Sequence, residues 1–238
     1  GQKQVEERLL PPPASIEHEG ELRVFVQPHA GRGAHAVAWH ERLSAGRRRI
    51  LLTIAPGPDA PAARARAIAQ IGAALRTNPQ AARAAHARTW HAYYPQSFVS
   101  VPDAQIESFY WIQMYKLASA TRADDPAIDT LGPWYHRTPW PGIWWNLNVQ
   151  LSYWPVYTAN RLALGESLRQ LVVRNQRALA ENVPAAMRAD ASAVGRTSAQ
   201  DAVSPLDEID LMKAQGDAPR EHGNFMWALH DLYLHQRM

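Results

Sequence analysis

Aromatic and amide side chains gather in residues 134–155, which hold five of the nine tryptophans of this 238-residue chain. Aromatic rings with a few convergent polar groups are typical of small-ligand sites. Rings stack on the apolar faces of a pyranose, and neutral amides bond its hydroxyls without bringing in a charge. We therefore predict a sugar site in this segment. The residues expected to bind substrate are Trp140, Trp144, Trp145, Gln150, Trp154 and His136.

Asn146 and Asn148 stand one residue apart, and their spacing predicts where the two amides point. Alternate side chains share a face in an extended strand, so the two amides would converge on one point. A helix would separate them by about 200°. We therefore expect an extended backbone over 146–148, with a helix free to begin afterwards. If residues 144–154 were all extended, Gln150 and Trp154 would share the polar face.

A neutral amide pair is limited in its chemistry. It cannot remove a proton at neutral pH, but it can orient a water molecule beside a carboxylate that transfers the proton. We assign this catalytic role to Asn146 and Asn148. The alternative is that both amides bond loop backbone and hold an aromatic core together.

Apolar periodicity and turn residues predict the elements that must position this segment. Residues 1–20 are polar and expected to be a loop or an ordered arm, and strands are expected at 22–26, 34–40 and 49–54, with a turn at 44–46. Helices are expected at 62–76, at 79–93, from the cap Asp103 to about 122, from about 158 to 183, and at 224–238. The third of these helices should bury Ile106, Phe109, Tyr110, Gln113, Met114 and Leu117.

Composition excludes several classes of function. The chain has no cysteine, which rules out disulfides and thiolate metal sites, and its net charge is only +3. The one tight basic run, Arg47–Arg49, leads into apolar residues and favours a strand entry over a phosphate site, so we expect no nucleic-acid partner. No apolar run approaches the ~18 residues that span a bilayer, so no membrane partner is expected. The N-terminus lacks the apolar stretch of a signal peptide.

The histidines and the other carboxylates are weaker candidates for catalytic or ligand-binding roles. The ten histidines form no metal motif, so we predict no metal and no cofactor. His136 and His230 are the histidines best placed by their neighbours to reach a sugar. Glu166 could act as an acid near the aromatic cluster, but an exposed helix residue is the simpler interpretation. Asp124-Asp125 and Asp207-Glu208 fit caps or turns.

The segment resembles the Trp-rich active-site motif of glycoside hydrolase family 95, which contains inverting α-L-fucosidases and α-L-galactosidases. The matching pieces are Pro139-Trp140, Asn146-Leu147-Asn148-Val149-Gln150 and Tyr153-Trp154-Pro155. Residues 90–94, 106–122 and 223–230 resemble the family's helical region in the same order. The strands before Pro56 resemble the last part of its N-terminal β-sandwich.

The resemblance implies a mainly α fold, part of an (α/α)6 barrel preceded by the remnant of a β-sandwich. The implied domains are a partial β-domain at 1–56, a helical linker at 57–95 and a partial barrel at 96–238. In an inverting mechanism an acid and a base carboxyl about 6.5–9.5 Å apart flank the positioned water. The family carries both further along its chain, so we expect them outside these residues and expect the chain to be inactive alone. A periplasmic or secreted location is also implied.

Three alternatives remain open from the residues. The chain could be a carbohydrate-binding module without catalysis. It could be a structural fragment that packs against the rest of a larger enzyme or against another copy of itself. Similar aromatic pockets occur in rhamnosidase-like glycosidases, so α-L-rhamnoside cleavage is a further alternative.

Overall fold

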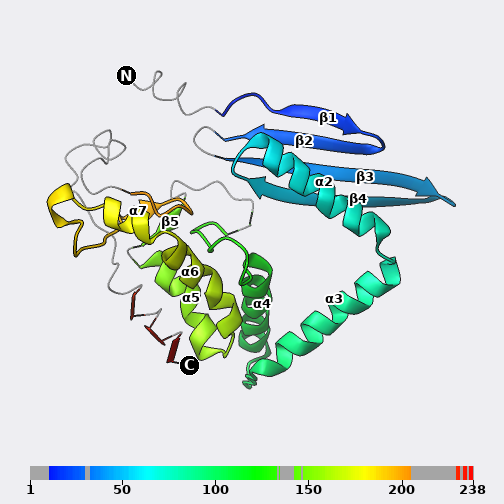
Figure 1. The fold of residues 1–238 in the computed structure, drawn as a ribbon. Helices are drawn as coiled ribbons and strands as arrows, with labels where there is room; N and C mark the ends of the chain where they lie inside the picture. Colours follow the sequence, from blue (N-terminus) through cyan, green and yellow to red (C-terminus); the bar gives the residue numbers. More distant parts are fainter. Residues whose placement is uncertain are drawn as a thin grey trace. The chain divides into compact units, whose positions relative to one another are not determined.

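The computed structural model describes residues 11–29, 33–132, 134, 142–145 and 147–204, together with 229–230, 233–234 and 236–237. The chain divides into two compact units, Gly1–His91 and Ala92–Met238, called unit 1 and unit 2 below. Each is described by itself (Figure 1).

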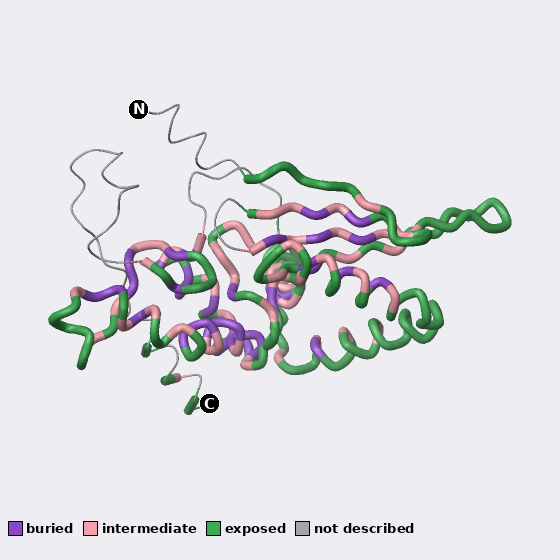
Figure 2. Tube along the Cα trace, turned by 45° about the horizontal axis from the view of Figure 1, so that its top comes forward, coloured by how far each residue is buried: buried purple, intermediate pink, exposed green. Residues whose placement is uncertain are grey.

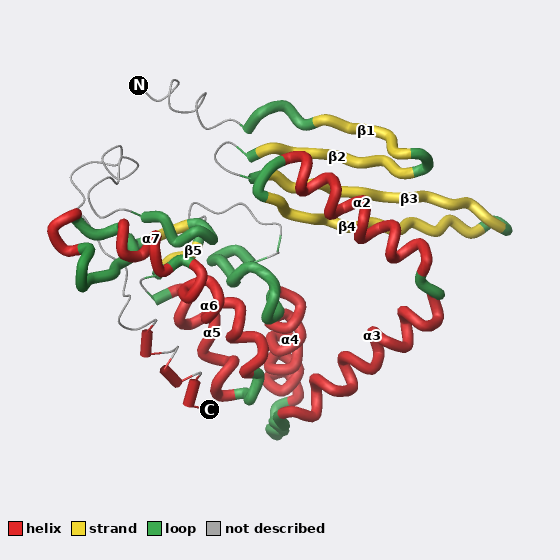
Figure 3. Tube along the Cα trace, viewed as in Figure 1, coloured by secondary structure: helices red, strands yellow, loops and turns green. Residues whose placement is uncertain are grey.

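Four antiparallel strands form the sheet of unit 1 (Figure 3). They are β1 (Ser15–Glu19), β2 (Leu22–Pro28), β3 (Ala34–Ser44) and β4 (Arg47–Gly57), in that order across the sheet. The three strands predicted from the sequence are confirmed, and each is longer than expected. The loop predicted before them is wrong at β1, which pairs with β2 although its own sequence is mostly polar.

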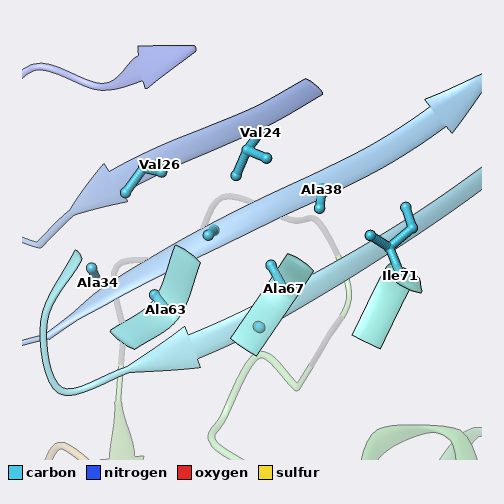
Figure 4. Packing of buried hydrophobic residues seen from close by; sticks show 9 residues of the cluster. Val24, Val26, Ala34, Ala38, Ala63, Ala67 and Ile71 are labelled. Atoms are coloured by element: carbon cyan, nitrogen blue, oxygen red, sulfur yellow. The ribbon is translucent and has the colours of Figure 1, made fainter. Parts of the chain in front are cut away.

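Helix α2 (Ala60–Arg76) covers one face of this sheet (Figure 4). Asp59 caps it by accepting a hydrogen bond from the Ala62 N–H at 2.8 Å. Small side chains let the helix approach the strands closely. The buried cluster consists of Val24, Val26, Ala34, Ala36, Ala38 and Ala55 from the strands and Ala63, Ala67 and Ile71 from the helix.

On the opposite face of the sheet, β4 carries exposed apolar residues, and Figure 2 shows the exposure of positions along the strands. On β4, Ile50, Leu52 and Ile54 keep 51%, 62% and 63% of their surface exposed. Within the described part of unit 1, the sheet is thus one layer covered by a helix. After α2, helix α3 (Pro79–Tyr93) has the bounds predicted from its Asn78-Pro79 start and buries only Tyr93.

Unit 2 holds short helices and one very short strand pair. Its elements are η1 (Tyr94–Gln96), α4 (Ala104–Ala120), β5 (Ile143–Trp144), α5 (Asn148–Thr158), α6 (Leu162–Arg174), α7 (Gln176–Glu181), η2 (Ala185–Met187) and β6 (Thr197–Ser198). Helices α5 and α6 pack together, and β5 pairs with β6. No helix in the described residues is long and apolar enough to cross a membrane.

The prediction of an (α/α)6 barrel is wrong for the described residues, which show a four-stranded antiparallel sheet followed by helices that form no barrel. The long helix expected over 158–183 is also wrong. The chain already leaves α5 at Thr158, reverses at Asn160 (φ 53°), and breaks again at Asn175 between α6 and α7. These interruptions leave helices of 6 to 13 residues in place of one long barrel helix.

The predicted buried face of the third helix is correct only toward its C-terminal end. Met114 and Leu117 are buried in α4, whereas Ile106 and Phe109 are 61% and 64% exposed. The hydroxyl of Tyr93 donates to the Met114 carbonyl at 2.8 Å, which places the packing contact near that end. The last predicted helix falls mostly outside the described residues.

Candidate functional site

The segment before α5 is fixed by its pairing with β6. Ile143 lies opposite Ser198 and Trp144 opposite Thr197. Gly142 enters this pair with φ 85°, and a Cβ there would lie 2.9 Å from the Ser198 carbonyl oxygen. A glycine is therefore required at 142 both for its backbone conformation and for the close approach of the two strands.

Trp145 is a core residue of unit 2. Its ring is fully buried, its indole N–H donates to the Ser198 hydroxyl at 2.8 Å, and its backbone N–H donates to the Arg196 carbonyl at 2.9 Å. Burial of the indole with its one donor satisfied is the usual arrangement of a tryptophan that stabilises a fold. The sugar-binding role predicted for Trp145 stays a prediction, and the contacts described here are with the protein.

Gln150 is also fully buried, and both ends of its amide bond backbone groups. Its nitrogen donates to the Trp145 carbonyl at 2.7 Å, and its oxygen accepts the Leu147 N–H at 3.0 Å. Leu147 adopts φ 98° and ψ −52°, a region that costs a non-glycine residue about 1–3 kcal/mol. The Gln150 amide therefore holds the backbone on both sides of position 146 and maintains the strained residue.

Asn148 is the first residue of α5 and is exposed. Its carbonyl accepts the Ser152 hydroxyl at 3.0 Å, while none of the described residues hydrogen-bonds its side-chain amide. The amide is thus open to solvent at the end of the strained turn. Its partner in the predicted pair, Asn146, lies outside the described residues, as do Trp140 and His136.

The extended backbone expected over 146–148, and considered for 144–154, is wrong from Leu147 onward, because Leu147 has φ 98° and α5 begins at Asn148. On a helix Gln150 is rotated by about 200° from Asn148, which turns it into the core. Trp154 is rotated by about 240° and is 41% exposed. The polar face inferred from strand alternation therefore does not exist in α5.

Trp144 and Trp154 are the predicted sugar-binding rings with accessible surface in the described residues. The Arg196 guanidinium carbon lies 5.4 Å from the centre of the Trp144 ring, a distance at which a cation is attracted to the ring. One face of Trp144 thus has a positive charge near it. Trp154 lies on the exposed side of α5 with Leu147 and Leu151.

A buried hydroxyl network lies beneath α5. The Tyr153 oxygen accepts the Ile128 N–H at 2.8 Å and is 2.8 Å from the Ser167 hydroxyl, to which Thr121 also donates at 2.8 Å. Burial raises the pKa of the Tyr153 hydroxyl, although its hydrogen bonds act in the opposite direction. The phenol stays protonated and joins α5 to α6. No periodicity signals Ser167 or Thr121 in the sequence, so this network was missed.

The carboxyl of Glu166 is committed to neighbours on its own helix. Arg169 contacts its two oxygens at 2.5 and 2.7 Å, and the Gln170 amide donates at 2.5 Å. A two-point contact with a guanidinium favours the ionised carboxylate, which suits an ion pair better than a proton donor. Among the described residues no three histidine, aspartate or glutamate side chains gather to hold a metal ion.

A separate hollow of about 460 Å³ lies in unit 2 beside α6, α7 and residues 188–192. Arg188 and Asp190 are its charged lining residues, and none of the predicted sugar-binding residues lines it. Because Arg188 already donates to the carbonyls of Glu181 and Val183, its guanidinium serves the local loop. The hollow is therefore a weaker candidate than the start of α5.

No protein-family model matches the chain, and no curated protein matches it. The arguments about function therefore rest on the motif residues and on their geometry. That geometry offers an exposed amide beside a strained turn and two accessible indoles. Such a surface can hold hydroxyl groups or a water molecule.

Proposed function

We propose that this chain binds carbohydrate at the start of α5, within a site that hydrolyses terminal α-L-fucosyl or α-L-galactosyl residues with inversion. In this proposal Asn148, together with Asn146, orients the attacking water. Trp144 and Trp154 offer ring faces to sugar. The proposal is supported by the resemblance of this segment to the family 95 motif, and the acid and base carboxyls are expected from outside this chain.

The observation that carries the proposal is the strained turn at Leu147. Unfavourable backbone conformations persist where the surroundings maintain them, and they concentrate at functional sites. Here a fully buried Gln150 uses both ends of its amide to maintain that conformation, and the next residue is the exposed Asn148. The strain is understandable if the direction of the Asn148 amide matters for a ligand.

A carbohydrate-binding role without catalysis is the second candidate. It is favoured by the state of Glu166, the carboxyl considered as an acid near the aromatic cluster, which is paired with Arg169. Binding by an exposed amide and two rings needs no proton transfer. The two candidates share the site and differ only in turnover.

Tryptophan fluorescence titrated with L-fucose, L-galactose and L-rhamnose tests the shared site. We expect saturable binding of one of these sugars and a loss of at least about tenfold in affinity for Asn148→Ala, since ~1.4 kcal/mol corresponds to tenfold. Gln80→Ala, an exposed amide in unit 1, is the matched control and should bind normally. If no sugar perturbs the fluorescence, or if Asn148→Ala binds as well as the wild type, the proposed site is wrong. Release of an aryl α-L-fucoside's leaving group separates the enzyme from the binding module.

A further inference from the structure

Two histidine side chains meet at the β2–β3 end of unit 1. Nε2 of His29 lies 3.1 Å from Nδ1 of His35, and the two ring centres are 5.3 Å apart with the planes inclined by 36°. His29 is exposed and His35 is partly buried. The pair is therefore open to ions from solvent on one side.

The backbone and the neighbouring ring hold this pair in place. The His29 N–H donates to the Gly33 carbonyl at 3.0 Å, which closes the chain between the two histidines. Gly33 has φ 89°, and a Cβ there would come within 3.5 Å of the His29 ring nitrogen Nδ1. His35 lies within β3, opposite Gln27 and with its ring centre 6.2 Å from that of Phe25. These contacts limit the orientations that the two imidazole rings can adopt before an ion binds.

The separation of the two nitrogens matches the edge of a metal coordination polyhedron. Imidazole nitrogens bind zinc at about 2.0–2.1 Å, which puts two of them about 3.3–3.4 Å apart in a tetrahedron and about 2.9 Å apart at a right angle. The observed 3.1 Å lies between these values. Small rotations of the two rings, which direct both lone pairs outward, would let one ion bridge the nitrogens.

We propose that His29 and His35 form a two-histidine site for a divalent transition-metal cation such as Zn²⁺, Ni²⁺ or Cu²⁺. Imidazole suits these ions, whereas Mg²⁺ and Ca²⁺ prefer oxygen ligands. No third side-chain ligand joins the pair in the described part of the chain, so water completes the coordination. The ion links the end of β2 to the start of β3.

The protonation state is compatible with this role. In the neutral pair one of the facing nitrogens carries the shared proton, and on metal binding that proton moves to the far nitrogen of the same ring, so both facing nitrogens become ligands. Burial and the neighbouring His29 lower the pKa of His35, which keeps its imidazole neutral, as metal binding requires. The site does not involve α5, so it is independent of the proposed carbohydrate function.

Isothermal titration of the untagged chain with ZnCl₂ at neutral pH tests the site. We expect one ion per chain, and His29→Gln and His35→Gln should each weaken binding by at least about tenfold, because even a second-shell change costs about 10–100-fold. His86→Gln is the matched control, since His86 lies on α3 and contacts only Trp90 in the described residues. Both ring resonances should also shift with Zn²⁺ in histidine-selective NMR spectra.

The proposal fails if the wild type binds no Zn²⁺ at millimolar concentration. It also fails if either His29→Gln or His35→Gln keeps the wild-type affinity, because a single remaining imidazole cannot chelate. Far-UV circular dichroism establishes that each variant is folded. Since His29 is exposed, its replacement leaves the buried cluster of unit 1 untouched.

Discussion

Replacing Arg161 with methionine should destabilise unit 2. Arg161 is 1% exposed, and in the described residues no carboxylate pairs with it. Its guanidinium donates instead to the carbonyls of Tyr93 and Tyr94 and to the Gln96 side-chain oxygen, and its central carbon lies 4.0 Å from the centre of the Tyr93 ring. The side chain therefore satisfies carbonyls where α3 gives way to η1.

The magnitude is a balance between lost bonds and recovered hydration. A hydrogen bond to a charged group contributes about 1.5–3 kcal/mol, and a buried acceptor left without its donor costs about 1–3 kcal/mol. The contact with the Tyr93 ring adds about 0.5–2 kcal/mol. Against these gains, burying a cation without a counter-charge costs several kcal/mol, and the Nε of Arg161 has no partner. We expect Arg161→Met to lower the free energy of unfolding by about 2–4 kcal/mol.

Urea unfolding followed by tryptophan fluorescence measures this change, because Trp145 is buried in the same unit. Arg174→Met is the control: Arg174 is exposed in the last turn of α6, and its replacement should change stability by less than about 0.5 kcal/mol. Arg161→Lys should be intermediate, since a lysine keeps the charge and cannot reach three acceptors at once. Equal or greater stability of Arg161→Met would refute the reasoning, because it would mean that desolvation of the charge outweighs its bonds.

Three further predictions concern other described residues. Tyr153→Phe should cost about 1–3 kcal/mol in urea unfolding, because it removes the acceptor of the partly buried Ile128 N–H and the bond to the buried Ser167 hydroxyl, whereas Tyr110→Phe should cost little. In folded unit 1 the pKa of His35 is lowered, first by burial and second by the neighbouring His29. Below the ordinary histidine pKa of 6.5 the unfolded chain therefore binds a proton that folded His35 takes up only at lower pH, so the stability of unit 1 should fall as the pH drops below 6.5. Replacing His35 with glutamine should flatten that slope, and an unchanged slope would contradict it. Gly142→Ala should destabilise by more than about 1 kcal/mol, because its Cβ would meet the Ser198 carbonyl at positive φ, and an unchanged melting temperature would exclude the strain.

Local signals in the sequence were sufficient to predict the helices that have clear capping residues and the strands that have an alternating pattern. The Asn78-Pro79 start predicts α3 with its observed bounds, and the partial alternation in residues 22–26 predicts β2. The sequence of β1 has no such alternation. The strand forms because it pairs with β2 and because Arg64 of α2 binds Glu17 and Glu19 at 2.6 Å. Contacts of that kind join residues far apart in sequence and leave no periodicity to detect.

The start of α5 shows a different limit. The alternation of Asn146, Asn148 and Gln150 is too short to distinguish a strand from a helix. The same residues can form a helix when one of their side chains is buried and hydrogen-bonded. Pro155 lies inside α5, although a proline inside a helix removes one backbone hydrogen bond. What decides the conformation is the burial of the Gln150 amide and the hydrogen bonds of Trp145 to residues 196 and 198, about fifty positions further along the chain.

The amides of this segment divide between the two roles that the sequence left open. Gln150 takes the structural one, since both ends of its buried amide bond the backbone around the turn. Asn148 is the opposite case, because its amide is exposed beside a residue whose conformation is unfavourable. A purely structural turn would relax if Gln150 were free to bond an unstrained backbone. The strained residue lies directly before the open Asn148 amide, so binding of sugar by Asn148→Ala is the measurement that decides between a structural and a functional turn.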